Sequence, residues 1–110
     1  HNIVAVGTKD QDIMAAVEAI REMQGGLVVC QGGRPIARLP LPICGLLSPD
    51  PAEAVSNQFE HLESVAAGLG KLPPAPFALL SFIALPVIPE LRLTDMGIVD
   101  VTQFKLLKDV

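Results

Sequence analysis

Histidine and cysteine side chains are the first candidates for chemistry in this sequence, because they bind metals and act as bases or nucleophiles. The chain has two of each: His1, His61, Cys30 and Cys44. No CxxC, HxH or HExxH pattern brings them into ligand spacing, so the sequence predicts no metal ligand within this chain. We expect His61 on the exposed or half-buried surface of a helix. Both cysteines are expected to be buried free thiols in a reducing compartment, and no positive charge adjacent to Cys44 would activate it.

Phosphate-binding and nucleophile motifs are incomplete in this sequence. The segment GLGK at 68–71 contains part of a P-loop, but no glycine precedes it at the required spacing and Leu72 stands where Ser or Thr is needed. We therefore expect it to end a helix. The serines lack the Gly-x-Ser-x-Gly setting of an activated nucleophile: Ser48, Ser56, Ser64 and Ser81. The residues alone thus predict no catalytic residue and no self-sufficient active site in this chain.

The composition argues against nucleic-acid and membrane functions. Eight basic and 12 acidic residues give a net charge of −4, whereas nucleic acid requires clustered Lys and Arg. The longest apolar stretch, 77–88, is interrupted by Pro86 and is shorter than the roughly 20 residues of a membrane-spanning helix. No signal-peptide pattern is present, so we expect a cytoplasmic protein. With 50% hydrophobic residues, the chain is more apolar than a small solitary domain needs, which predicts a face covered by oligomerisation or by another domain.

Apolar periodicity and turn residues predict the elements that would hold any site. A capping box of Thr8 and Gln11 is expected to begin the first helix, and Gly25-Gly26 to end it. Asp50 is expected to cap the second helix. The segment 77–85 fits either a short buried helix or a buried strand. The predicted elements are, in chain order, a strand at 3–6, a helix to Met23, strands at 27–30 and 34–39 joined by Gly32-Gly33, a helix from Pro51 to about Gly68, strands at 91–94 and 98–101, and a last strand from Phe104.

These elements predict one α+β domain over residues 1–110. The order resembles β-α-β-β-α-β, with two amphipathic helices packed on a mainly antiparallel, mixed sheet.

Several segments together resemble one family, the bacterial and archaeal adenine deaminases of the amidohydrolase superfamily, in their C-terminal domain. The resemblance follows the family's order and spacing over nearly the whole chain. The matching segments are HNIVAVGT, the D-x-D of Asp10 and Asp12, GGLVV, LPLPICGL, PAE at 51–53, LSFIALPVIPELRLTD and GIVDV.

The resemblance implies a hydrolase that converts adenine and water into hypoxanthine and ammonia, in purine salvage or adenine catabolism. It implies a manganese or iron centre in an upstream barrel domain, which would hold the metal ligands and be the partner of this chain. A homo-oligomer is also expected. The chain would be the C-terminal part of that enzyme, beginning within a functional loop, and is expected to be inactive by itself.

The resemblance places His1 and Asn2 in a loop near the mouth of the active site. One hypothesis is that either side chain orients the purine or closes the pocket, since an amide can bond two atoms of a purine edge. The other is that the pair only leads into the first strand and frays. An alternative for the whole chain is a stand-alone small-metabolite-binding or regulatory α+β module, which a parent gene without an upstream barrel would favour.

Overall fold

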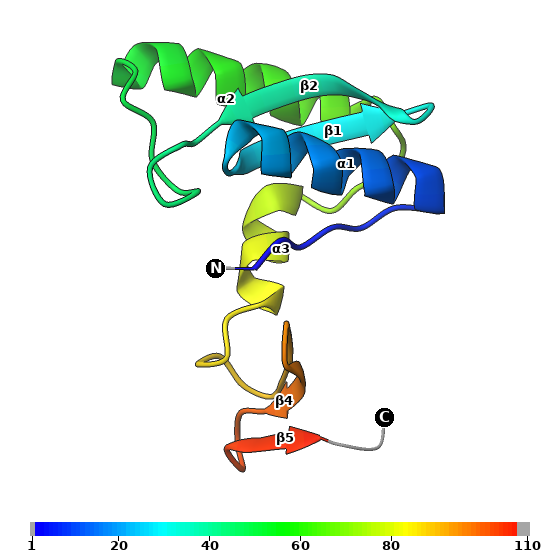
Figure 1. Ribbon diagram of the computed structural model, residues 1–110, viewed down its shortest axis with the longest axis vertical. Helices are drawn as coiled ribbons and strands as arrows, with labels where there is room; N and C mark the ends of the chain where they lie inside the picture. The colour runs from blue at the N-terminus through cyan, green and yellow to red at the C-terminus, as the bar shows by residue number, and fades with distance from the viewer. Residues whose placement is uncertain (1, 108–110) are drawn as a thin grey trace. The chain divides into compact units, whose positions relative to one another are not determined.

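The computed structural model describes residues 2–107, which group into two compact units (Figure 1). One unit is Ala5–Pro74. The other, which we call the C-terminal unit, consists of the described parts of His1–Val4 and Ala75–Val110. The expectation of a single domain over 1–110 stays a prediction.

The Ala5–Pro74 unit is a hairpin with two helices packed against it. Its elements are α1 (Asp10–Met23), β1 (Gly26–Gln31), β2 (Arg34–Pro40) and α2 (Ala52–Ala67). The strands pair antiparallel, and α1 contacts mainly β1 whereas α2 contacts mainly β2. Apolar side chains from all four elements form the core: Ala19, Val29, Ala37, Leu39, Leu62 and Ala66. This unit therefore has its own small hydrophobic core.

The hairpin forms where the sequence predicts it. Gly32 and Gly33 have φ values of 65° and 73°, the left-handed conformation that a tight two-residue turn requires at both positions. Along β2, Ala37 and Leu39 are buried while Ile36 and Arg38 are exposed, so one face of the strand packs on the helices. The predicted strands at 27–30 and 34–39 are confirmed.

The helices form as predicted, but their ends differ. The residue before α1 is Lys9, and no side chain caps it, so the capping box of Thr8 and Gln11 is wrong. At the other end Gln24, with φ 60°, takes the left-handed position that was expected of the pair Gly25-Gly26. Asp50 does not cap α2, because Pro51 occupies the N-cap position.

The predicted strand at 3–6 is wrong. Residues 2–7 belong to no helix or strand, and Ile3 and Val6 are exposed. A strand requires a backbone partner, and the described chain pairs no strand with this segment.

The C-terminal unit contains α3 (Pro76–Ile83), β3 (Leu91–Thr94), β4 (Gly97–Asp100) and β5 (Lys105–Leu107). The segment that fitted either helix or strand is thus a helix, which begins with Pro76 in its first turn. The three strands form an antiparallel sheet in the order β3-β4-β5. Thr94 stabilises the β3–β4 turn, since its Oγ donates to the Gly97 carbonyl at 2.8 Å.

The α+β class is confirmed, but the expected single mixed sheet with two helices is wrong. Residues 2–107 contain two separate antiparallel sheets and three helices. The reason is local pairing, because tight turns join β1 to β2 and β3 to β4. Residues Pro76–Ile83 form a helix, so the alternative strand that could link the two sheets is absent from the described chain. None of the helices in the described chain is long and apolar enough to span a membrane.

Candidate functional site

Of the two predicted site residues, Asn2 is described and His1 lies outside the described residues. Asn2 is exposed, in a segment without helix or strand that groups with the C-terminal unit. Its amide offers two N–H donors and one carbonyl acceptor to a neighbouring group. The structure thus leaves the Asn2 side chain accessible.

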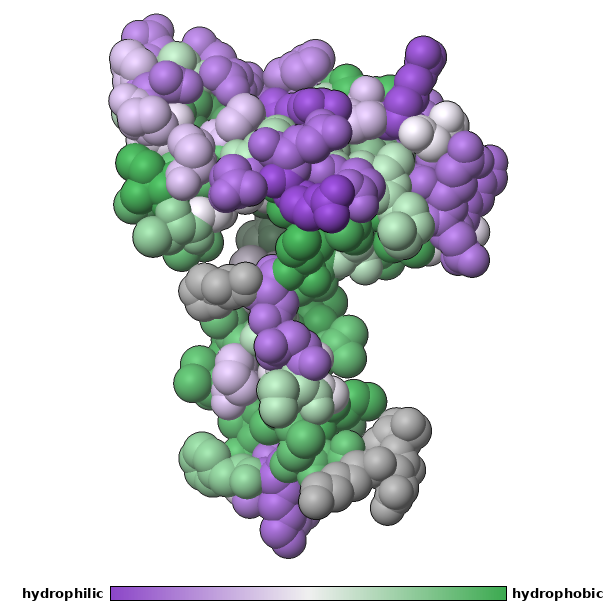
Figure 2. Space-filling view, viewed as in Figure 1, coloured by the Kyte–Doolittle hydropathy of each residue, from purple (hydrophilic) through white to green (hydrophobic). Residues whose placement is uncertain are grey.

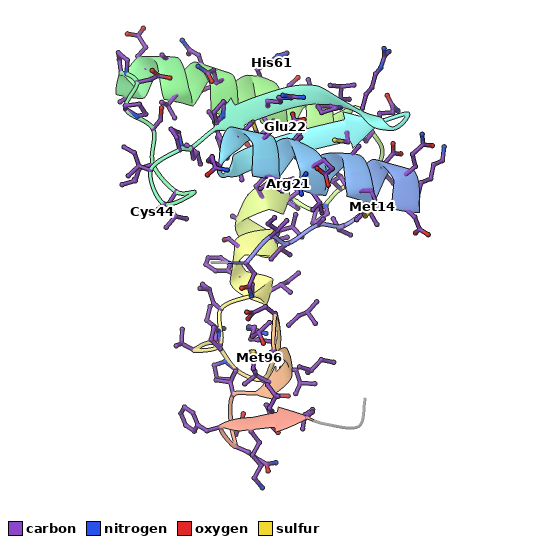
Figure 3. The ribbon with its side chains drawn as sticks, in the orientation of Figure 1. Met14, Arg21, Glu22, Cys44, His61 and Met96 are labelled. Atoms are coloured by element: carbon purple, nitrogen blue, oxygen red, sulfur yellow. The ribbon has the colours of Figure 1, made fainter. Side chains whose placement is uncertain are left out.

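The described residues do not form a metal centre. Within residues 2–107, no group of three or more His, Cys, Asp or Glu side chains could hold a metal ion. His61 is exposed on α2, as predicted for a residue of a helix surface (Figure 3). Glu60 and Glu63 flank it in sequence, but Glu60 is exposed and the three make no ligand set.

The two cysteines have different surroundings, and both are free. Cys30 is half-buried on β1. Burial raises the pKa of its thiol, and the carboxylate of Asp12 raises this pKa further, while the guanidinium of Arg38 lowers it by a smaller amount. Cys44 is exposed, so its predicted burial is wrong. It lies in a turn with φ 56°, beside Gly45, and Figure 3 shows its side chain on the loop between β2 and α2. A raised pKa keeps the Cys30 thiol protonated at neutral pH, which makes it a poor nucleophile.

Asp12 links the first helix to the hairpin, a role that sequence reasoning missed. Its Oδ1 accepts a hydrogen bond of 2.6 Å from the backbone N–H of Gly33. The side chain of Gln11 also lies against Gly33. Asp12 belongs to the D-x-D motif, one of the segments that carry the family resemblance. Its role here is structural, because it fixes the β1–β2 turn on the first turn of α1.

The segment LPLPICGL builds a loop that closes on the α1–β1 junction. The N–H of Leu41 donates to the carbonyl of Gly25 at 3.1 Å, and Ile43 and Leu47 form a β-bridge. Gly25 and Gly45 approach so closely that a side chain at Gly25 would overlap the Gly45 backbone. Gly25 and Gly45 therefore serve a close backbone contact.

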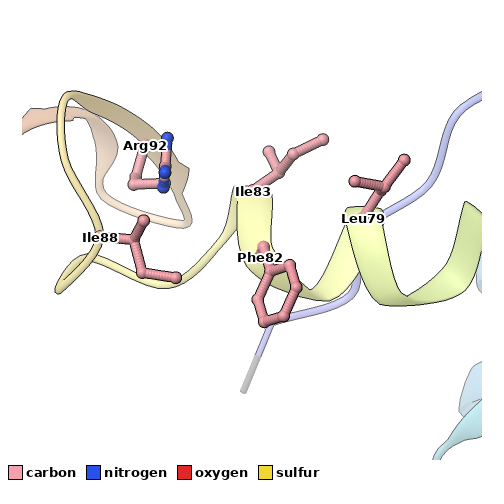
Figure 4. A pocket seen from close by; sticks show the side chains of 5 residues that line it. All are labelled: Leu79, Phe82, Ile83, Ile88 and Arg92. Atoms are coloured by element: carbon pink, nitrogen blue, oxygen red, sulfur yellow. The ribbon is translucent and has the colours of Figure 1, made fainter.

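The segment LPVIPELRLTD, with α3, builds an open hollow of about 640 Å³ in the C-terminal unit (Figure 4). Its lining is apolar except for one guanidinium: Leu79, Phe82, Ile83, Ile88 and Arg92. Arg92 is fixed by its own turn, since Nη1 donates to the Leu91 carbonyl at 2.6 Å and Nη2 to the Pro89 carbonyl at 2.7 Å. Its buried Nε has no hydrogen-bond partner. The five described lining residues include no general acid, general base or nucleophile, and their apolar side chains suit an apolar group.

Comparison with known proteins identifies relatives over nearly the whole chain. The family described as the adenine deaminase C-terminal domain matches residues 1–105. A protein of Dehalococcoides mccartyi named adenine deaminase is 53% identical over 107 residues, which are 97% of this chain and 19% of that protein. Proteins with the same name from Brucella anthropi and Desulforamulus reducens are each 50% identical, over 94% and 100% of this chain. The chain spans about a fifth of the length of these curated relatives.

Proposed function

The chain belongs to the adenine deaminase C-terminal domain family, and from this membership we propose that it is the C-terminal domain of an adenine deaminase. The enzyme would hydrolyse the C–N bond at the amidine carbon of adenine, releasing ammonia and leaving hypoxanthine. The observation that carries the proposal is the pattern of coverage: nearly all of this chain matches, but only about a fifth of each relative does. The comparisons give no support to a stand-alone binding module.

The manganese or iron centre of such an enzyme does not fit the described residues of this chain, because they contain no ligand set. We therefore place the metal, its ligands and the reacting water in the remaining four fifths of the enzyme, in an upstream barrel domain. The C-terminal domain would contribute scaffold and interface. Its apolar surface also supports a homo-oligomeric enzyme, and light scattering of the intact protein measures that assembly directly.

Within this chain, the residue we assign to the substrate side is Asn2, with His1 beside it in sequence. Two features support the assignment: the Asn2 amide is exposed, and Asn2 lies in a segment that belongs to no helix or strand. A planar amide can donate to one atom of a purine edge and accept from the neighbouring one. Asn2 would thus orient adenine, while the hydrolysis itself occurs on groups of the barrel.

The intact enzyme carrying Asn2→Ala tests this assignment. We expect kcat/KM for adenine to fall about tenfold or more, the effect of losing one bidentate contact, with an unchanged melting temperature. Asn2→Asp keeps the shape but removes the amide donors, and should also lose activity. Lys9→Ala, at another exposed position before α1, is the matched control and should retain activity. Unchanged kinetics in both Asn2 variants would remove Asn2 from the site.

A further inference from the structure

The first strand of the C-terminal unit's sheet, β3, has its apolar side chains on the exposed face. Along β3, Leu91 and Leu93 are 53% and 55% exposed, whereas the polar Arg92 and Thr94 are half-buried. Alternate residues of a strand lie on the same face, so Leu91 and Leu93 share one face. In a sheet that packs on its own core, the apolar face would be the buried one. The pattern here is the reverse.

Strand register extends this apolar face across the sheet. Leu93 pairs with Ile98 on β4, and Ile98 pairs with Leu107 on β5, which places these three side chains in one row on the face that also carries Leu91. We call this surface, made of Leu91, Leu93, Ile98 and Leu107, the outer sheet face. The neighbouring row on the same face is Leu91, Asp100 and Lys105, so one end of this face carries two charges of opposite sign.

Among the described residues of the same unit, no helix packs on the outer sheet face. The helix α3 makes at most marginal contact with β3, β4 and β5. From Ala75 to Leu107, Val101 is the one large side chain described as buried. Figure 2 shows apolar residues spread over the visible surface of this unit. A three-stranded sheet needs a packed face to be stable, so this sheet requires a covering surface from elsewhere.

We infer that the outer sheet face docks on the remaining four fifths of the same polypeptide, against an apolar face of that part. The inference rests on the chain being one lobe of a longer protein, as in the proposed function, but it does not require adenine to be the substrate. The relatives are about five times as long as the matched segment, so a covering surface is available within one chain. A tethered partner is present at an effective concentration of about millimolar, far above that of a second molecule. A mainly apolar surface that carries few charges is also typical of permanent interfaces.

Site-resolved thiol alkylation of the intact protein tests this docking. Leu93→Cys places a thiol on the outer sheet face, and Asn57→Cys places one on the exposed polar surface of α2 as a matched control. Mass spectrometry of peptides separates both from the native Cys30 and Cys44. We expect the thiol at 93 to react about tenfold or more slowly in the folded intact protein than in urea, and the thiol at 57 to react at nearly equal rates. Leu91→Cys, on the same face, is the second variant if Leu93→Cys does not fold.

Each outcome decides the inference. Protection that persists on dilution to the monomer supports docking within one chain. Protection that disappears on dilution assigns the face to a second copy and overturns the inference. An unprotected thiol in a folded enzyme that still deaminates adenine also overturns it, while the proposed function stands. A protected thiol in an intact protein without deaminase activity supports docking and contradicts the proposed function instead.

Discussion

Single side chains in this domain mostly position backbone. Asp12 holds the turn of the β1–β2 hairpin, Arg92 fixes the turn before β3 with two bonds to backbone carbonyls, and Thr94 bonds the end of the β3–β4 turn. Each is a polar residue in a segment that resembles a family signature. At the residue scale, these signatures therefore specify shape.

Replacing Asp12 with alanine should destabilise the chain by about 1 to 2 kcal/mol. The half-buried N–H of Gly33 would lose a charged acceptor at 2.6 Å, and such bonds contribute more than neutral ones. Asp10→Ala is the matched control: Asp10 is exposed in the same helical turn, and its removal should cost only about 0.5 kcal/mol through the helix dipole. Urea unfolding of both variants measures the difference, and equal losses would contradict the role of Asp12.

The Cys30 thiol should react with iodoacetamide only at higher pH than an ordinary cysteine. Burial, and then the charge of Asp12, raise the pKa of this thiol. The folded state therefore favours the protonated form, and the stability this contributes is present below the pKa of the unfolded thiol and is lost as pH rises through the raised value. Alkylation rates measured by mass spectrometry from about pH 7 to 10 locate the midpoint. A midpoint below that of a free cysteine would contradict the burial argument.

Residue-scale predictions from the sequence succeeded where the cause is local. The exposure of His61 follows from its place on an amphipathic helix, beside Glu60 and Glu63. The exposure of Cys44 did not follow, because it depends on a loop that closes against Gly25, far away in sequence. The bond from Gly33 to Asp12 is also non-local and was missed for the same reason. The role of Asn2 stays a prediction.

The same distinction holds for elements. The β1–β2 hairpin was predictable because Gly32-Gly33 specifies its turn without help from the rest of the chain. The strand at 3–6 was predicted from β-branched composition alone, and composition does not supply a pairing partner. The split into two sheets likewise depends on which strands meet, which periodicity does not encode.

Two glycine-to-alanine variants distinguish a glycine needed for close backbone packing from a glycine needed only for its left-handed backbone. Gly25→Ala should strongly destabilise the chain, because its φ of 119° disfavours a side chain and the new methyl would overlap the Gly45 backbone. We expect roughly 1 to 3 kcal/mol from backbone strain and a similar cost from overpacking. Gly32→Ala has nothing within 4 Å of the new methyl, so only the left-handed backbone cost of about 1 to 2 kcal/mol applies. Chemical denaturation ranks the two, and an equal loss would contradict the close packing of the 41–47 loop.

At the scale of the whole molecule, many of the apolar residues that the sequence has in excess lie on the surface. The described residues include a small core in the Ala5–Pro74 unit and large exposed apolar side chains in both units. A chain of this composition that buries so few large side chains is suited to a place within a larger assembly. In the proposed function, that assembly is a longer enzyme of the same family, whose catalytic region would be about four times as long as this domain.

The most direct test compares the intact protein with the isolated chain of 110 residues in a deamination assay. Both are incubated with adenine and added manganese, and released ammonia is measured. We predict that the intact protein produces hypoxanthine and ammonia at equal rates while the isolated chain produces none above the buffer. Ammonia released from adenine by the isolated chain, or none from the folded, metal-loaded intact protein, would contradict the account.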